Sequence, residues 1–125
     1  MSPEEVTLRV LVVDDDEDVL VMIGDALRAR GYEVATAREG REAIELAEAF
    51  EPDVALVDVV LPDVSGITLA SILRGATPHE GRPRIVAYSG SDALKLREAV
   101  QRGLFDDCVV KPATLERIER AIRAY

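Results

Sequence analysis

The sequence has 125 residues, which is long enough for one domain with a hydrophobic core and too short for two. Hydrophobic residues make up 48% of it, yet no apolar run approaches the roughly 20 residues that a membrane-spanning helix needs. The net charge of −9 argues against binding to nucleic acid, because the phosphate backbone attracts basic surfaces, so we expect a single domain over residues 1–125 without a nucleic-acid or membrane interface.

Apolar runs alternate with segments of helical periodicity along the chain. The first run is apolar at every position from Val10 to Val13, so both faces of that strand are expected to be buried. The predicted elements, in chain order, are a strand at 8–13, a helix at 17–30, a strand at 33–36, a helix at 41–50, a strand at 54–57, a helix through Ile67, Ala70 and Leu73, a surface loop at 75–83, a strand at 84–88, a helix at 92–102, a strand at 108–110 and a helix at 114–125.

Three of these helices have a recognisable apolar face. Its residues are Val19, Ile23, Ala26 and Leu27 in the first helix, Ala43, Ile44 and Ala47 in the second, and Leu115, Ile118, Ile122 and Tyr125 in the last. Asp16 is expected to cap the first helix and Gly31 to end it. Five βα units joined by short connections predict an α/β fold, with helices covering both faces of a parallel sheet.

Polar residues follow four of the five predicted strands, at the sheet edge where ligands bind in this class of fold. These residues are Asp14 and Asp15 after the first strand, Asp58 after the third, Ser89 after the fourth and Lys111 after the fifth. Two carboxylates about 4 Å apart repel by roughly 4 kcal/mol near a protein surface, so such a cluster needs a compensating charge. Because three carboxylates and one lysine leave an excess negative charge that a divalent cation cancels, the pattern predicts a Mg²⁺ site.

The same cluster suits the chemistry of phosphoryl transfer. A carboxylate such as Asp58 can act as a nucleophile and form an aspartyl phosphate. Ser89 can donate a hydrogen bond to a phosphoryl oxygen, and Lys111 can place its positive charge at another. Phosphoryl transfer depends mainly on positioning and electrostatics, so these few groups are sufficient for it.

Four segments carry a resemblance to a known family: VLVVDDDED, VDVVLPDVSG, VAYSG and CVVKPA, in this order. They resemble the signatures of response regulator receiver domains and together span nearly the whole chain. The resemblance implies a flavodoxin-like, doubly wound α/β fold with five helices and a five-stranded parallel sheet in the order 2-1-3-4-5. It also implies that Asp58 is the phospho-acceptor, that Asp15 and Asp58 bind Mg²⁺, that Asp14 acts through the water shell of the ion, and that the backbone carbonyl of Val60 is a further ligand.

Further expectations follow from the same resemblance. Ser89 and Lys111 match the hydroxyl and lysine positions of the family, and the peptide bond before Pro112 is often cis in its members. The implied partners are a histidine kinase or phosphotransfer protein, which donates the phosphoryl group from a phosphohistidine, and a downstream protein. The downstream protein is expected to bind the face formed by the helix at 92–102, the strand at 108–110 and the helix at 114–125. Cys108 occupies the position where the family usually has an aromatic switch residue. The implied function is a signalling switch that catalyses only its own phosphorylation and dephosphorylation and is not an enzyme with a separate substrate.

Two other functional classes fit parts of the pattern. A Mg²⁺-dependent phosphatase of the haloacid-dehalogenase type uses strand-end aspartates, but DDDED lacks the threonine of a DxDxT pattern, and no segment is left for a cap domain. A flavin-binding module of the same topology is disfavoured because the acidic first turn would repel the FMN phosphate. Within the leading interpretation, the chain is a stand-alone regulator, a phosphorelay intermediate, or the receiver part of a larger regulator or hybrid kinase.

The expected location is the cytoplasm. The N-terminal sequence MSPEEVTLRV lacks the basic and apolar regions of a secretion signal. Cys108 is the only cysteine, so no internal disulfide can form, which fits a reducing compartment.

Overall fold

A computed structural model describes residues 7–76, 83–90 and 93–123. Within these residues, strands and helices alternate in the order β1 (Arg9–Val13), α1 (Glu17–Ala29), β2 (Glu33–Ala37), α2 (Gly40–Phe50), β3 (Val54–Val57), α3 (Gly66–Ala76), β4 (Arg84–Ser89), α4 (Ala93–Gln101), β5 (Asp107–Val110) and α5 (Leu115–Arg123). The alternation that the sequence predicts is therefore confirmed. Most of the expected loop at 75–83 and the expected inward position of Tyr125 fall outside the described residues.

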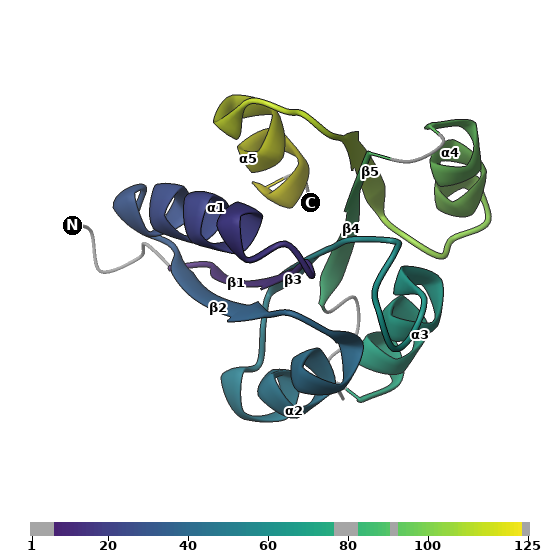
Figure 1. Ribbon diagram of the computed structural model, residues 1–125, viewed down its shortest axis with the longest axis horizontal. Coiled ribbons are helices and arrows are strands. Elements are labelled where there is room, and N and C mark those ends of the chain that lie inside the picture. The colour runs from purple at the N-terminus through teal and green to yellow at the C-terminus, as the bar shows by residue number, and fades with distance from the viewer. Residues whose placement is uncertain (1–6, 77–82, 91–92, 124–125) are drawn as a thin grey trace.

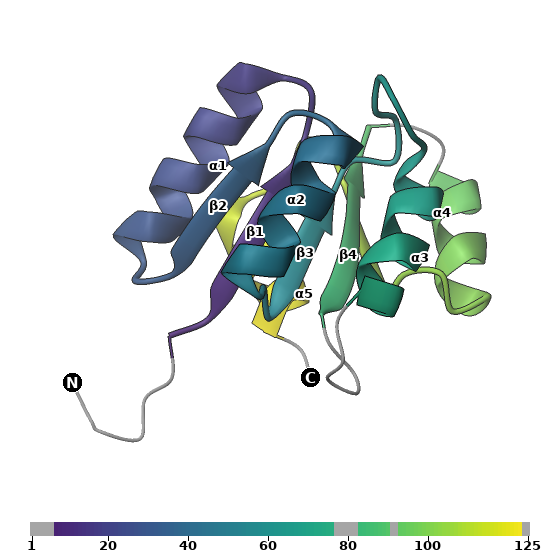
Figure 2. The same cartoon turned by 90° about the horizontal axis from the view of Figure 1, so that it is seen from below.

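The strands form one parallel sheet in the order β2-β1-β3-β4-β5. In Figure 1, α1 and α5 lie on one face of this sheet, and α2 and α3 lie on the other. Figure 2 shows α2, α3 and α4 in a row over that second face. The α/β doubly wound architecture and the strand order 2-1-3-4-5 are thus both confirmed.

The two faces of the sheet carry separate hydrophobic clusters because neighbouring residues of a strand point to opposite faces. On the α1 and α5 side, Val10 and Val12 of β1 pack with Leu27 and Ile122. On the other side, Leu11 and Val13 of the same strand pack with residues of α2, α3 and α4, including Ala47, Leu73 and Leu96. Every residue of β3 is buried, as expected for a central strand that is covered on both faces.

The first helix begins as the sequence predicts and buries a slightly different face. The Asp16 side chain accepts hydrogen bonds from the backbone N–H groups of Asp18 and Val19, at 3.0 and 3.3 Å, and so caps α1. The fully buried residues of α1 are Leu20, Ile23, Gly24 and Leu27, whereas the predicted Val19 and Ala26 are only half-buried. The apolar face is therefore rotated toward Leu20 relative to the expected one.

The remaining helices follow their predicted faces with small differences. Ala43 and Ala47 of α2 are buried and Ile44 is half-buried, while Ile118 and Ile122 of α5 are buried and Leu115 is half-buried. In α3, Ala70 and Leu73 are buried, but Ile67 is 39% exposed. None of the helices in the described parts of the chain is long and apolar enough to cross a membrane.

Candidate functional site

The carboxyl ends of β1, β3, β4 and β5 bring the predicted site residues together. Val13 of β1 is in register with Val57 of β3, so Asp14 and Asp58, the next residues, leave adjacent strands side by side. The backbone N–H of Asp58 donates to the Val13 carbonyl at 2.9 Å, and that of Lys111 donates to the Ser89 carbonyl at 3.1 Å. The sheet hydrogen bonding thus continues into the site and fixes the backbone there.

Three carboxylates meet at this edge of the sheet. Asp14, Asp15 and Asp58 each offer an oxygen atom, and these atoms all lie within 4.8 Å of one another. Asp14 and Asp58 are buried, with 2% and 8% of their surface exposed, whereas Asp15 is exposed to solvent. An all-oxygen donor set of this kind, open on one side, fits a hard divalent cation that keeps part of its water shell.

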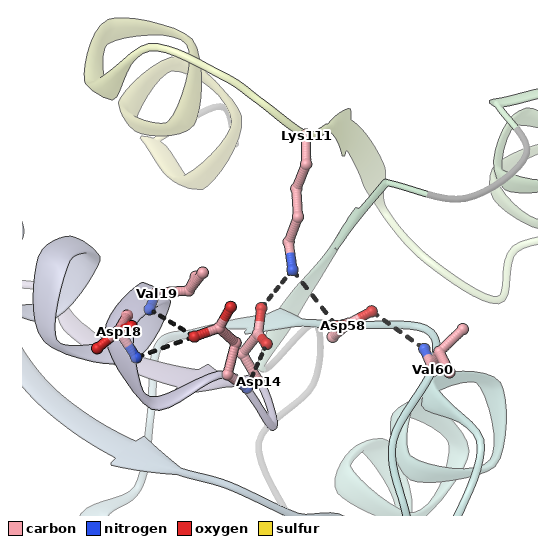
Figure 3. A network of polar contacts seen from close by, with 7 residues as sticks. Asp14, Asp18, Val19, Asp58, Val60 and Lys111 are labelled. Carbon is pink, nitrogen blue, oxygen red and sulfur yellow. Dashed lines mark hydrogen bonds and ion pairs between the residues drawn. The ribbon is translucent and has the colours of Figure 1, made fainter.

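The ammonium group of Lys111 lies between two of these carboxylates (Figure 3). Its Nζ atom is 2.5 Å from Asp14 Oδ2 and 3.4 Å from Asp58 Oδ2. Burial acts to lower the pKa of Lys111, but the hydrogen bond and charge of Asp14, together with the charge of Asp58, outweigh it and raise that pKa above its usual value. Lys111 therefore carries a full positive charge against the acidic cluster at neutral pH.

Burial has the opposite effect on the pKa of Asp14, because it disfavours the charged form of an acid. It raises the pKa of the Asp14 carboxyl group above the usual value, although hydrogen bonds from Lys111 and from the backbone N–H of Asp16 act to lower it. The negative charge of Asp58 adds to the increase. The Asp14 carboxyl group is therefore easier to protonate than an ordinary aspartate, even though it contacts Lys111.

The loop between β3 and α3 holds Asp58 from the other side. The backbone N–H of Val60 donates to Asp58 Oδ1 at 3.1 Å, and Val60 forms an isolated antiparallel bridge with Ser65. A Cβ atom at Gly66 would lie only 2.5 Å from the Asp58 carbonyl oxygen, so this close approach of α3 to the strand end requires glycine. The Val60 side chain points away and is 64% exposed.

Asp63 lies in the same loop as Val60 and is not among the predicted site residues. Its carboxylate accepts hydrogen bonds from the backbone N–H groups of Gly40 and Arg41, each at 2.9 Å, at the start of α2. The residue before this helix, Glu39, makes no side-chain cap of its own. Asp63 therefore caps α2 from a distant loop and fastens the β3–α3 loop to it. The unsupported helix start at Gly40 is the sequence signal that could have indicated a distant cap.

Ser89 and Cys108 occupy the two strands at the other end of the sheet. Ser89 is the last residue of β4 and is 2% exposed, beside Lys111. Cys108 in β5 is half-buried and packs against the core cluster of α2, α3 and α4. It also lines a cavity of about 700 Å³ over β5, to which Arg97 of α4 and Arg117 at α5 contribute. The peptide bond between Lys111 and Pro112 is cis, as the sequence resemblance implies.

Comparison with known proteins supports the family that the sequence resembles. Residues 10–123 match the family described as response regulator receiver domain. The probable transcriptional regulatory protein TcrX of Mycobacterium tuberculosis is 38% identical over 115 residues, which cover 92% of this chain and 48% of TcrX. The chain therefore spans about half the length of that curated relative.

Solved structures agree with this comparison. A response regulator from Burkholderia pseudomallei, with a phosphorylated aspartic acid, a calcium ion and citrate, superposes with a TM-score of 0.83 at 29% identity, covering 94% of this chain and 67% of that one. The chemotaxis protein CheY4 of Vibrio cholerae superposes with a TM-score of 0.82 at 26% identity, covering 93% of this chain and 99% of that one.

Proposed function

The chain belongs to the response regulator receiver domain family, whose members act in phosphorylation-controlled signalling, and on this premise we propose that Asp58 accepts the phosphoryl group. The observation that carries the proposal is the convergence of Asp14, Asp15, Asp58 and Lys111 at one edge of the sheet. The phosphorylated aspartic acid of the related Burkholderia protein supports it.

In the proposed reaction, a carboxylate oxygen of Asp58 attacks the phosphorus atom of a phosphohistidine. The new O–P bond gives an acyl phosphate, the P–N bond of the donor breaks, and the imidazole leaves with the bonding electrons. Val60 N–H binds Asp58 Oδ1 and Lys111 faces Asp58 Oδ2, so both oxygens of the nucleophile have a defined environment before the reaction. Attack of water on phosphorus later returns the carboxylate and releases inorganic phosphate.

Mg²⁺ is the cofactor that this site would take. Asp14, Asp15 and Asp58 would hold it, together with the backbone carbonyl of Val60, because their oxygen atoms suit a hard cation. The ion would supply the positive charge that allows an anionic donor to approach three carboxylates. The Lys111 ammonium would form an ion pair with one phosphoryl oxygen, and the Ser89 hydroxyl would donate a hydrogen bond to another.

The proposed partners follow from the same chemistry. The donor is a histidine kinase or a phosphotransfer protein, and a downstream protein reads the phosphorylated form at the face made by α4, β5 and α5. We place the domain, over residues 1–125, in the cytoplasm, as a regulator that turns over no separate substrate. TcrX is a probable transcriptional regulator, which supports a role in gene regulation. Because this chain is acidic, any contacts with DNA would be made by another part of the protein or by a partner.

Labelling by a small phosphodonor tests the proposal. Incubation with acetyl phosphate and Mg²⁺ is expected to add one phosphoryl group by intact-mass analysis, and a chelator is expected to abolish the adduct. Asp58→Asn should remain unlabelled. The matched control is Asp16→Asn, which removes a neighbouring negative charge while asparagine keeps the helix cap. An equal adduct on wild type and Asp58→Asn would reject Asp58 as the acceptor.

A further inference from the structure

Tyr88 lies directly beneath the functional site without belonging to the strand-end cluster. It precedes Ser89 in β4 and pairs with Val109 of β5 in the sheet register. Its side chain is 5% exposed and packs in the hydrophobic cluster on the α1 and α5 side, together with Val86 of the same strand. Since neighbouring residues of a strand point to opposite faces, Tyr88 and Ser89 approach the site from different sides of the sheet.

The aromatic ring of Tyr88 forms a third contact with the Lys111 ammonium. Lys111 Nζ lies over the ring at 5.1 Å from its centroid, within the range of a cation–π interaction. Such an interaction strengthens when the cation is desolvated, and the Lys111 side chain is only 22% exposed. The ammonium is thus held by two carboxylates and by one aromatic face.

Lysine needs this support because its ammonium is a compact charge on a flexible four-carbon stem. Lys111 follows β5 directly, and its backbone is fixed by the hydrogen bond to Ser89, but that bond leaves the side chain free to rotate. Asp14 and Asp58 attract the ammonium through their charges, whereas the Tyr88 ring contacts it with its face. A buried ring in a packed cluster provides a rigid surface for this purpose.

We propose that Tyr88 is a positioning residue that holds the Lys111 ammonium over the strand-end carboxylates, so that its ring, and not its hydroxyl group, sets the efficiency of phosphoryl transfer. The position of Lys111 is a property of the unphosphorylated protein. The effect on phosphoryl transfer rests on the proposed function, so the position of Lys111 and the rate of phosphoryl transfer are measured separately.

The first measurement uses the lysine content of the chain, which has only Lys95 and Lys111. Labelling with [ε-13C]lysine therefore gives two side-chain NMR signals, and Lys111→Arg assigns them. The Tyr88 ring current is expected to shift the Lys111 signal upfield of the Lys95 signal. Tyr88→Leu should remove this shift, Tyr88→Phe should retain it, and Val86→Ala, a change in the same buried cluster, should leave it in place.

The second measurement is the rate of phosphorylation by acetyl phosphate. Tyr88→Leu is expected to slow it about fivefold, the factor that about 1 kcal/mol of cation–π energy corresponds to. Tyr88→Phe should restore most of the rate. In the Lys111→Ala background, Tyr88→Leu should have no further effect, because the ring acts through the ammonium.

Each outcome supports or overturns the inference. The inference is overturned if Tyr88→Leu leaves the Lys111 NMR signal unchanged. It is also overturned if Tyr88→Leu slows phosphorylation equally in the Lys111→Ala background, or if Val86→Ala slows phosphorylation as much as Tyr88→Leu does. Thermal unfolding checks that each variant folds, and Tyr88→Met replaces Tyr88→Leu if the latter does not. If wild type is not phosphorylated at all, the proposed function fails, while the NMR measurement still decides the position of Lys111.

Discussion

At the scale of single residues, the functional site works against the stability of the fold. Asp14 is buried beside Asp58, and one lysine serves both carboxylates. Burial raises the pKa of Asp14, which means that its ionised carboxylate is less stable in the folded chain than it would be in water. Groups needed for function commonly reduce stability in this way.

Asp14→Asn should therefore raise the melting temperature at pH 7 when a chelator removes divalent cations. The pKa of Asp14 is higher in the folded chain than its ordinary value of 3.8, so ionised Asp14 destabilises the fold above the folded-state pKa. The advantage of the variant should shrink as the pH falls through that pKa and vanish below 3.8. Thermal unfolding between neutral and acidic pH measures this, with the exposed Asp15→Asn as control. A lower melting temperature for Asp14→Asn at pH 7 would contradict it.

Val60 is expected to set the lifetime of the phosphorylated form. Its side chain is 64% exposed, and its backbone N–H donates to Asp58 Oδ1, so a side chain at this position borders the solvent near that carboxylate. Valine cannot hydrogen-bond that water, whereas an amide can orient it. Val60→Asn should shorten the lifetime several-fold, measured as loss of the phosphoryl adduct after removal of the donor. Val21→Asn on α1 controls for loss of an exposed valine, and an unchanged or longer lifetime in Val60→Asn would remove this interpretation.

At the scale of elements, one carboxylate connects the phospho-acceptor loop to a helix. Asp63 caps α2 through Gly40 and Arg41, and its loop carries Val60. Hydrogen bonds from the backbone N–H groups of Arg41 and Gly40 hold the pKa of Asp63 below its ordinary value of 3.8. The loop next to Asp58 is therefore held in place by a contact that lies outside the site itself.

Asp63→Asn should lower the melting temperature by a few degrees at pH 7, because the amide cannot accept both hydrogen bonds. Since the pKa of Asp63 is lower in the folded chain, its carboxylate stabilises the fold above pH 3.8, and this contribution is lost as the pH falls through the folded-state value. The difference between wild type and variant should disappear in acid. Asp25→Asn, at an exposed position of α1, is the control and should change little. Equal effects of both variants would show that Asp63 is not a cap.

The elements themselves could be read from the sequence because their signals are local. The continuous apolar run at Val10 predicts a strand buried on both faces, and Asp16 caps α1 as its position before the helix indicates. The contacts of Asp63 and Tyr88 do not follow from local signals of this kind, because each joins a side chain to another element and neither residue directly follows a strand. The sequence also places Asp14, Asp58 and Lys111 at one edge of the sheet, but it cannot give their burial, which decides the direction of the pKa shift of Asp14.

At the scale of the whole molecule, the site and the predicted output face share two strands. Ser89 ends β4 and is in register with Val110 of β5, two residues from Cys108. Cys108 and Val110 line the cavity of about 700 Å³ that also involves α4 and α5. The Arg117 guanidinium donates to the Cys108 carbonyl at 3.1 Å, which joins α5 to the same strand. A change at Ser89 is thus a short distance along the sheet from the surface that a partner would bind.

We expect Ser89, and not Cys108, to carry the signal to this face. Phosphorylation can shift the conformation only through groups that interact differently with the two states, and the Ser89 hydroxyl is the group that could bind the new phosphoryl oxygens. Cys108 is half-buried and too small to change place as an aromatic side chain would. Ser89→Ala should therefore greatly reduce the backbone amide NMR shifts that phosphorylation induces in α4 and β5, whereas Cys108→Ser should preserve them. Both variants must first reach the same extent of phosphorylation by intact mass. If Cys108→Ser abolishes the shifts while Ser89→Ala retains them, the cysteine is the switch and the hydroxyl is not.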